Sequence, residues 1–124
     1  MKTRLGEIEI LGKKYYLNYS VRASRKFGEI EKPKKDETFQ DYWERYIKYL
    51  AILLKEGADY AESILGEHVE RRFTEEELLL LISPADCSEM IEAVNTAFER
   101  GNNREVDVEP GKNAESAAEE TKAG

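Results

Sequence analysis

An amphipathic stretch in the middle of the chain, from Thr38 to Leu54, most constrains what this sequence can fold into. Its apolar residues recur at steps of three and four, the spacing of one face of an α-helix. Thr38, followed three residues later by Asp41, resembles a capping box with Asp in place of the usual Glu or Gln. The apolar positions are Phe39, Tyr42, Trp43, Tyr46, Ile47, Leu50, Leu53 and Leu54.

This stretch also holds the only tryptophan, Trp43, and three of the seven tyrosines. A small domain has few places to bury such large side chains, so we expect this helix to be the spine of the core, with Trp43 buried. The chain has 124 residues, which favours one domain. Its longest apolar runs are far shorter than the roughly 20 residues of a membrane span.

The N-terminal sequence lacks a signal-peptide pattern, and a single cysteine, Cys87, allows no internal disulfide. We therefore expect a cytoplasmic protein. Residues 1–37 carry ten Lys or Arg and six Asp or Glu, whereas the whole chain has a net charge of −7. The acidic remainder argues against general nucleic-acid binding, because phosphates would be repelled. The unevenness is most simply a solvated surface.

A β-hairpin is expected between Leu5 and Tyr19. Gly12 and Lys13 suit a two-residue type II′ turn, because Gly stands first. Folding about that turn pairs Ile10 with Tyr15 and Ile8 with Leu17, on one face of the hairpin. A lone hairpin is marginally stable in water, so this face should pack on the helices.

Four further segments complete the prediction. A short helix runs from a Ser20 cap to about Glu31, with Val21, Ser24, Phe27 and Ile30 on one face. The central helix continues to Gly66, with Gly57 either ending or loosening it. After a connector at 67–73, Thr74 starts a helix that carries Leu78 to Ile82, and Ser83-Pro84 opens a last helix that Gly101 stops.

The sequence therefore predicts a mainly α domain with a small N-terminal β-hairpin, an α+β arrangement of four to five helices over residues 1–100. Residues 101–124 have no aromatic side chain and are rich in Glu, Ala, Gly and Asn. Such a composition cannot bury enough apolar surface to offset the entropy of ordering, so we expect a disordered acidic tail.

Catalytic and metal-binding patterns are absent from the sequence. His68 is the only histidine and has no ligand spacing around it. Cys87 is best interpreted as a buried structural cysteine. The run Glu75, Glu76 and Glu77 suits a helix start, because neighbouring helical side chains diverge by about 100°. We therefore expect no catalytic residue, cofactor or metal, and no enzymatic activity.

Binding residues are predicted from surplus apolar surface. The consecutive residues Leu78, Leu79, Leu80, Leu81 and Ile82 surround their helix, and one small core cannot cover every side of it. Periodicity alone is equally compatible with a helix buried on all sides. Tyr49 lies off the central apolar face and is the best candidate for an exposed aromatic contact. The remaining aromatic residues of that helix are more simply core than a platform for stacking bases.

Three segments, taken in order, resemble a known family. GKKYYLNYSVRASRKFGEI (12–30), YLAILLKEGADYA (49–61) and FTEEELLLLISPADCSEMIEAVNTAFERG (73–101) are similar to the strand–turn–strand–helix opening, leucine-rich middle and amphipathic ending of tail assembly chaperones from long-tailed, siphovirus-type bacteriophages and prophages. The motifs are degenerate, and their order carries the resemblance over about residues 5–100.

The resemblance implies a non-enzymatic protein of the bacterial host cytoplasm. Such a protein keeps the tape measure protein soluble, helps to recruit tail tube subunits and can self-associate. Many phages make a longer frameshifted product of this gene, and the present chain would be the shorter one. Nothing in the resemblance implies a nucleic-acid or membrane partner.

Two alternatives stay open at the level of sequence. One is a small regulatory protein that binds nucleic acid through basic residues near the N-terminus, namely Arg22, Arg25, Lys26, Lys32, Lys34 and Lys35. The other is an accessory subunit of a host enzyme.

Overall fold

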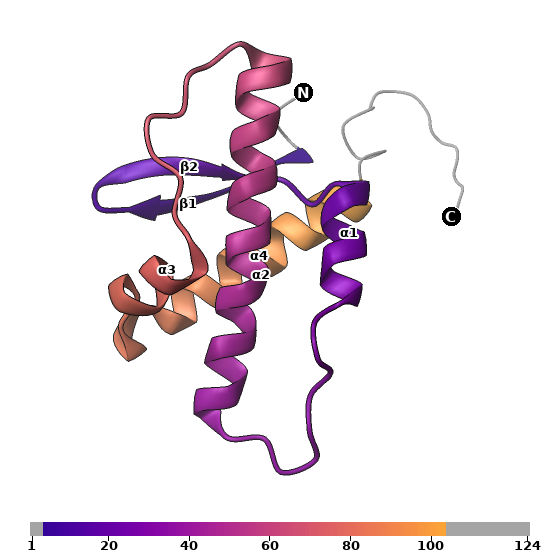
Figure 1. Ribbon diagram of the computed structural model, residues 1–124, viewed down its shortest axis with the longest axis vertical. Coiled ribbons are helices and arrows are strands. Elements are labelled where there is room, and N and C mark those ends of the chain that lie inside the picture. The colour runs from indigo at the N-terminus through magenta and orange to yellow at the C-terminus, as the bar shows by residue number, and fades with distance from the viewer. Residues whose placement is uncertain (1–3, 104–124) are drawn as a thin grey trace.

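The computed structural model describes residues 4–103 (Figure 1). The elements are β1 (Gly6–Ile10), β2 (Lys13–Leu17), α1 (Val21–Gly28), α2 (Phe39–Tyr60), the π-helical turn η2 (Ala61–Leu65), α3 (Glu75–Leu81), the 3-10 turn η3 (Pro84–Asp86) and α4 (Cys87–Asn102). The predicted mainly α fold with an N-terminal hairpin is confirmed. The expected tail lies almost wholly outside the described residues.

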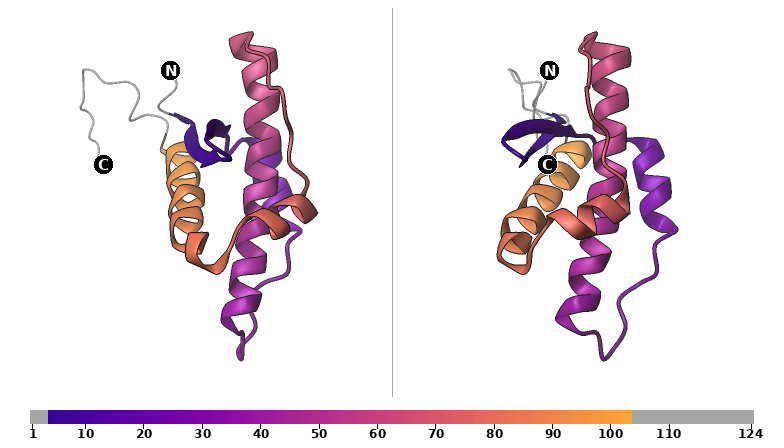
Figure 2. Two further views of the ribbon diagram at one scale, coloured as in Figure 1. Left: turned by 90° about the vertical axis from the view of Figure 1, so that its left-hand side faces the viewer. Right: turned by 60° about the vertical axis from the view of Figure 1, so that its left-hand side comes forward.

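The helix α2 runs the length of the molecule, and every other element is placed around it (Figures 1 and 2). The hairpin lies between two helices, because β2 packs on α2 while β1 packs on α4. The helix α1 lies along one flank of α2, and α3 crosses it on the other. The largest fully buried side chains are Leu5, Leu17, Leu50, Leu53, Leu78, Met90 and Val94, drawn from all these layers except α1.

The hairpin exists, but its turn and register differ from the prediction. The turn is Leu11-Gly12, with φ values of 52° and 79°, and the strands pair Ile8 with Tyr15 and Gly6 with Leu17. Positive φ at both central residues is the type I′ pattern, whose twist matches that of the strands. The true register is offset by two residues from the predicted one. Side chains alternate with period two, so the predicted inward face is unchanged.

The predicted helix starts are confirmed by their caps. The Ser20 hydroxyl accepts a hydrogen bond from Ala23 N, while Thr38 and Thr74 each form a complete capping box. Each cap pairs backbone N–H groups that would otherwise lack partners in the first turn. Gly66 ends η2 with a φ of 72°, as a left-handed cap requires.

The buried face of α1 differs from the predicted one. The helix stops at Gly28, two to three residues before the predicted end, and Val21 is 90% exposed. Ala23 is fully buried and Phe27 packs against the core, a spacing of four rather than three. The side of α1 that faces α2 is fixed by polar contacts of Ser20 and Arg22, which a count of apolar residues does not register.

Gly57 was expected to end or loosen the central helix and Gly101 to stop the last one, and both lie within helices at close contacts. A Cβ on Gly57 would stand 1.9 Å from the carbonyl oxygen of Tyr16, and one on Gly101 would stand 2.5 Å from that of Tyr19. The helices continue through both positions, to Tyr60 and Asn102. The predicted domain boundary after residue 100 therefore falls inside α4.

The expectation that Trp43 is buried is wrong, because it is only half-buried and packs on the edge of the core. A 22-residue helix is about 33 Å long. The hairpin lies across α2 and not along it, so it covers only part of the length of the helix (Figure 1). Burial on α2 is therefore concentrated from Ile47 onward.

We predict that Gly57→Ala destabilises the protein by about 3 kcal/mol or more, because the new methyl group would overlap the β2 backbone. In an open helix the same change stabilises by up to about 1 kcal/mol. Gly28→Ala is the matched control, since nothing lies within 4 Å of its Cβ position. Urea unfolding measures both, and equal midpoints would contradict the close packing.

We also predict that Leu50→Ala costs about 2–5 kcal/mol, because the Leu50 side chain is fully buried. Trp43→Ala should cost less than about 2 kcal/mol despite removing more atoms, since Trp43 is only partly buried at the edge of the core. Both values come from chemical denaturation followed by circular dichroism. The reverse order would place Trp43 in the core after all.

Candidate protein-binding surfaces

The apolar face of α2 continues beyond the elements that cover it. Phe39 is 78% exposed, and Tyr42, Trp43 and Tyr46 are half-buried. We call these four residues the aromatic end of α2. They stand at helical positions i, i+3, i+4 and i+7, so they form one continuous strip. The buried residues Ile47, Leu50, Leu53 and Leu54 extend the same strip into the core.

Ring contacts and polar bonds order this strip. The rings of Phe39 and Trp43 stack at 6.0 Å, and those of Tyr42 and Tyr46 lie 5.1 Å apart. The Tyr46 hydroxyl donates to Asn95 Oδ1 on α4 at 3.0 Å. Partial burial, followed by the nearby Tyr42, raises the pKa of Tyr46. The aromatic end is therefore a pre-formed surface.

The helix α3 exposes a second apolar group. Of the five predicted residues, Leu78 is fully buried, and Leu81 and Ile82 are half-buried. Leu79 is 44% exposed and Leu80 is 89% exposed; we call them the α3 leucine pair. The prediction that part of this run is exposed is confirmed for that pair. The side chain of Leu78 is part of the core.

Tyr49 is not an exposed aromatic contact. Its ring stacks on Phe27 at 4.5 Å and meets Tyr46 edge-on at 5.2 Å. Since α1 covers this side of α2, Tyr49 joins the two helices instead of facing a partner. Sequence reasoning placed Tyr49 outside and the aromatic end inside. In the structure Tyr49 is half-buried, like Tyr42, Trp43 and Tyr46, and Phe39 is the member of the aromatic end that is largely exposed.

A polar clamp joins α1 to α2 and was missed by the sequence analysis. Glu56 is 6% exposed and accepts hydrogen bonds from Ser20 Oγ at 2.8 Å and Arg22 Nε at 2.6 Å. Arg22 also donates to Asp59 at 2.5 Å. Burying a carboxylate is costly unless it is paired, so these partners belong together. A separation of 34 residues between Arg22 and Glu56 gives a local sequence reading no signal.

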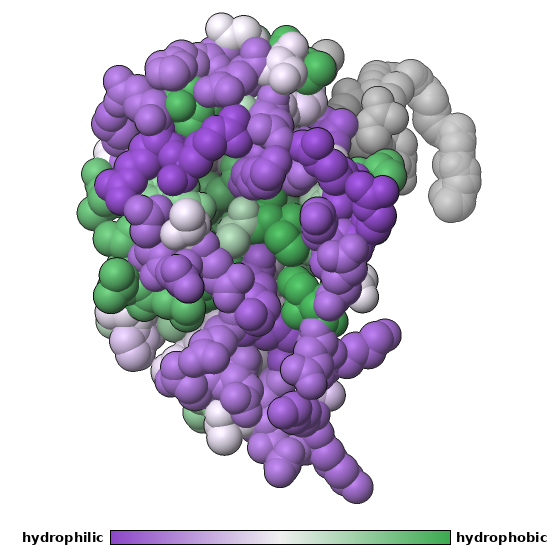
Figure 3. Space-filling model, in the orientation of Figure 1, coloured by the Kyte–Doolittle hydropathy of each residue, from purple (hydrophilic) through white to green (hydrophobic). Residues whose placement is uncertain are grey.

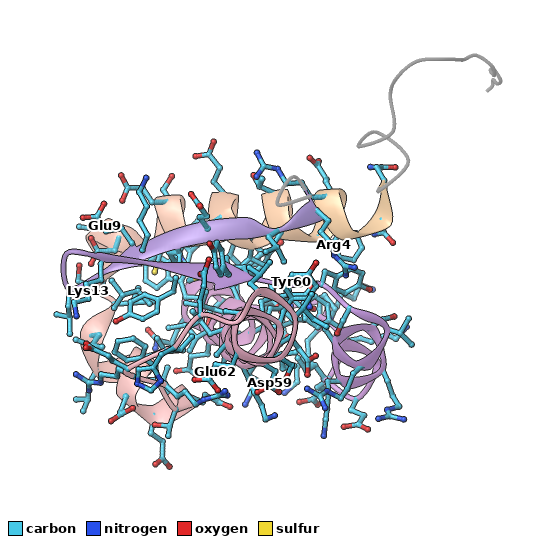
Figure 4. The ribbon with its side chains drawn as sticks, turned by 90° about the horizontal axis from the view of Figure 1, so that it is seen from above. Arg4, Glu9, Lys13, Asp59, Tyr60 and Glu62 are labelled. Carbon is cyan, nitrogen blue, oxygen red and sulfur yellow. The ribbon has the colours of Figure 1, made fainter. Side chains whose placement is uncertain are left out.

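Figure 4 looks down α2 and shows how its end divides two charged regions. Tyr60 lies on the hairpin side with the Arg4 guanidinium 5.4 Å from its ring centroid. Asp59 and Glu62 lie on the other side, where both bind Arg72 of the 67–74 connector, at 2.9 and 3.0 Å. Lys13 at the hairpin tip binds Glu70 at 2.9 Å. The connector is thus attached by ion pairs and by Phe73, whose side chain is buried in the core.

The residues that the sequence suggested for metal binding or catalysis, His68 and Cys87, do not form a site. The side chain of His68 is 80% exposed, and its nearest carboxylate, on Glu62, lies 3.9 Å away. Over residues 4–103, no group of three or more His, Cys, Asp or Glu side chains could hold a metal ion. Cys87 is buried, as predicted, and its thiol donates to the Ser83 carbonyl oxygen at 3.6 Å. Burial and then the nearby Asp86 raise the pKa of that thiol.

Comparison with known proteins gives no match: no family profile fits the chain, and neither a curated protein nor a solved structure is significantly similar to it. None of the helices in the described part of the chain has the length and hydropathy needed to cross a bilayer.

We predict that Cys87 reacts with Ellman's reagent at least about tenfold more slowly in the folded protein than in guanidinium, because burial and a raised pKa suppress the thiolate. The control is Ala85→Cys in a Cys87→Ser background, which places a thiol at an exposed site two residues away. Equal rates for the two folded proteins would show that Cys87 is accessible.

Proposed function

We propose that this protein is a non-catalytic tail assembly chaperone of a long-tailed phage or prophage, acting in the bacterial cytoplasm. It binds a helical segment of the tape measure protein, keeps that protein soluble and brings it together with tail tube subunits. The observation that carries the proposal is apolar surface left uncovered on two elements: the aromatic end of α2, where Phe39 is 78% exposed, and the α3 leucine pair.

The arrangement of this surface favours a helical partner. Phe39, Trp43 and Tyr46 stand at i, i+4 and i+7 on a rigid helix. Amphipathic helices bind to apolar surfaces through anchors of this spacing. Large exposed aromatic side chains are also the residues that contribute most to protein interfaces, because they bury much area at a small entropic cost. The continuity of the strip with the core holds these anchors in place.

Apolar exposure of this kind suits a chaperone. A long, amphipathic client would aggregate through its own apolar strips, and covering one of them prevents that contact. Binding through few residues gives modest affinity, so the client can be released to the growing tail. The binding role requires no bond-forming chemistry.

The proposal predicts a gene for a tape measure protein close to the gene for this chain, and the test is co-expression with the product of that gene. We expect the tape measure protein to become soluble and to co-purify with this chain. Leu80→Glu and Phe39→Glu should each weaken the complex by about tenfold or more, because a charge would be buried in the contact. Neither should change the unfolding midpoint strongly, since both residues are exposed.

Val21→Glu is the matched control, because Val21 is 90% exposed but lies on α1, away from the proposed surface. It should leave co-purification unchanged. A tape measure protein that is equally soluble without this chain, or variants that bind as well as the natural sequence, would refute the proposal.

A further inference from the structure

A second candidate surface lies on the side of α2 that carries Ala51 and Lys55, and of the buried residues of the core strip it includes Leu54. At 100° per residue, Ala51 and Lys55 are about 120° and 160° around the helix from Phe39. This side forms the floor of a groove of about 1350 Å³, bounded by α1, the 67–75 connector and the hairpin. Pockets for small molecules are about 300–1,000 Å³, so this groove suits a segment of polypeptide better. We call it the α2 groove.

The floor of the α2 groove is apolar and shallow. Ala51 and Ile52 are half-buried, while Leu54 and Ala58 are buried beneath them. Ala51 and Ala58 stand seven residues apart, two turns on one side of α2, and their small side chains allow a second backbone to approach closely. Figure 3 shows apolar surface in the middle of this face, surrounded by hydrophilic residues. The floor from Ala51 to Ala61 is about 15 Å long, or three helical turns.

The rim of the groove is basic although the protein is acidic. Its lining includes eight Lys or Arg and five Glu, a net charge of +3 against −7 for the whole chain. The cations stand on both walls, with Arg25 and Lys26 on α1 and Arg71 and Arg72 on the connector.

The cations on the connector wall of the groove form salt bridges within the described part of the protein, whereas two of those on the α1 wall do not. Arg72 binds Asp59 and Glu62, and Arg71 binds Glu77. Arg25 and Lys26 form no salt bridge with another residue of the described chain within 4.0 Å. The α1 wall therefore offers positive charge to an incoming group.

We propose that the α2 groove binds an amphipathic α-helix of another protein, whose apolar strip is flanked by carboxylates. The small residues of the floor accommodate the strip, and the cations of the two walls accept the carboxylates on either side. This inference concerns a different face from the aromatic end of α2, so it stands or fails independently of the proposed function.

Two other occupants fit less well. Residues 104–124 are acidic but contain no Leu, Ile, Met or aromatic residue, so they lack an apolar strip. A second copy could offer α3, the most acidic and apolar helix. That helix has only seven residues and buries Leu78, so it cannot leave its own core.

The experiment uses the full chain and a fluorescein-labelled, stapled peptide of about four helical turns, with leucines at i, i+3, i+4 and i+7 and glutamates beside them. A second peptide replaces each glutamate by lysine. Fluorescence anisotropy should show saturable binding of the acidic peptide, at least about tenfold tighter than that of the basic one. Raising the salt concentration should weaken it.

Variants place the binding in the groove. Arg25→Glu combined with Lys26→Glu should weaken the acidic peptide by about tenfold or more. Ala51→Trp should abolish binding by filling the floor. The matched control, Lys34→Glu with Lys35→Glu, makes the same change of charge outside the groove lining and should alter affinity less than about twofold. Circular dichroism confirms that each variant is folded.

Each contrary result overturns the proposal in a distinct way. No binding, equal binding of the two peptides, or equal effects of the two charge reversals would show that the groove does not select an acidic helix. Binding that appears only after residues 104–124 are removed would make that segment the occupant. Self-association in sedimentation velocity that Ala51→Trp abolishes would make a second copy the occupant.

Discussion

The closest contact between α2 and the hairpin is the constraint on which the rest of the structure depends. Because Gly57 has no side chain, the carbonyl group of Tyr16 can approach the backbone of α2 closely. One turn earlier in α2, the Leu53 carbonyl oxygen accepts a hydrogen bond from Asn18 N at 3.2 Å. An isolated hairpin has little stability of its own, so it needs this packing against α2. Gly6 allows a similar close contact between β1 and α4, because a Cβ at Gly6 would lie 2.8 Å from Ala97 Cβ. Small residues thus let two helices close on a two-stranded sheet.

The packing of the hairpin at Gly57 separates covered from uncovered surface on α2, both along the helix and around its axis. The half that carries Gly57 is covered by the hairpin, α4 and α1, and its side toward α1 is fixed by the Glu56 clamp. The other half extends past these elements, so the same apolar strip that makes the core ends as an aromatic surface. This result follows because the hairpin crosses α2, so it covers one part of the helix and leaves the other part to shorter contacts (Figure 1).

The functional proposals follow from this division. A strip of large aromatic side chains and a groove of small apolar residues with basic walls occupy different sides of one rigid helix. Among the described residues, no group of three or more His, Cys, Asp or Glu side chains in either arrangement could hold a metal ion. Both present shape, apolar area and charge, which are the means by which one protein recognises a helix of another.

The sequence by itself determined what depends on local chemistry. Helix starts at Ser20, Thr38 and Thr74 and the left-handed cap at Gly66 are set by residues within a few positions of one another, so a single sequence displays them. The inward face of the hairpin was also predictable, since alternation survives a shift of two residues. Only the tertiary structure decided which apolar residues are covered. Trp43 and Tyr49 are both half-buried, against expectation, because burial depends on where neighbouring elements end. The separation between Arg22 and Glu56 hides their pairing from any local pattern.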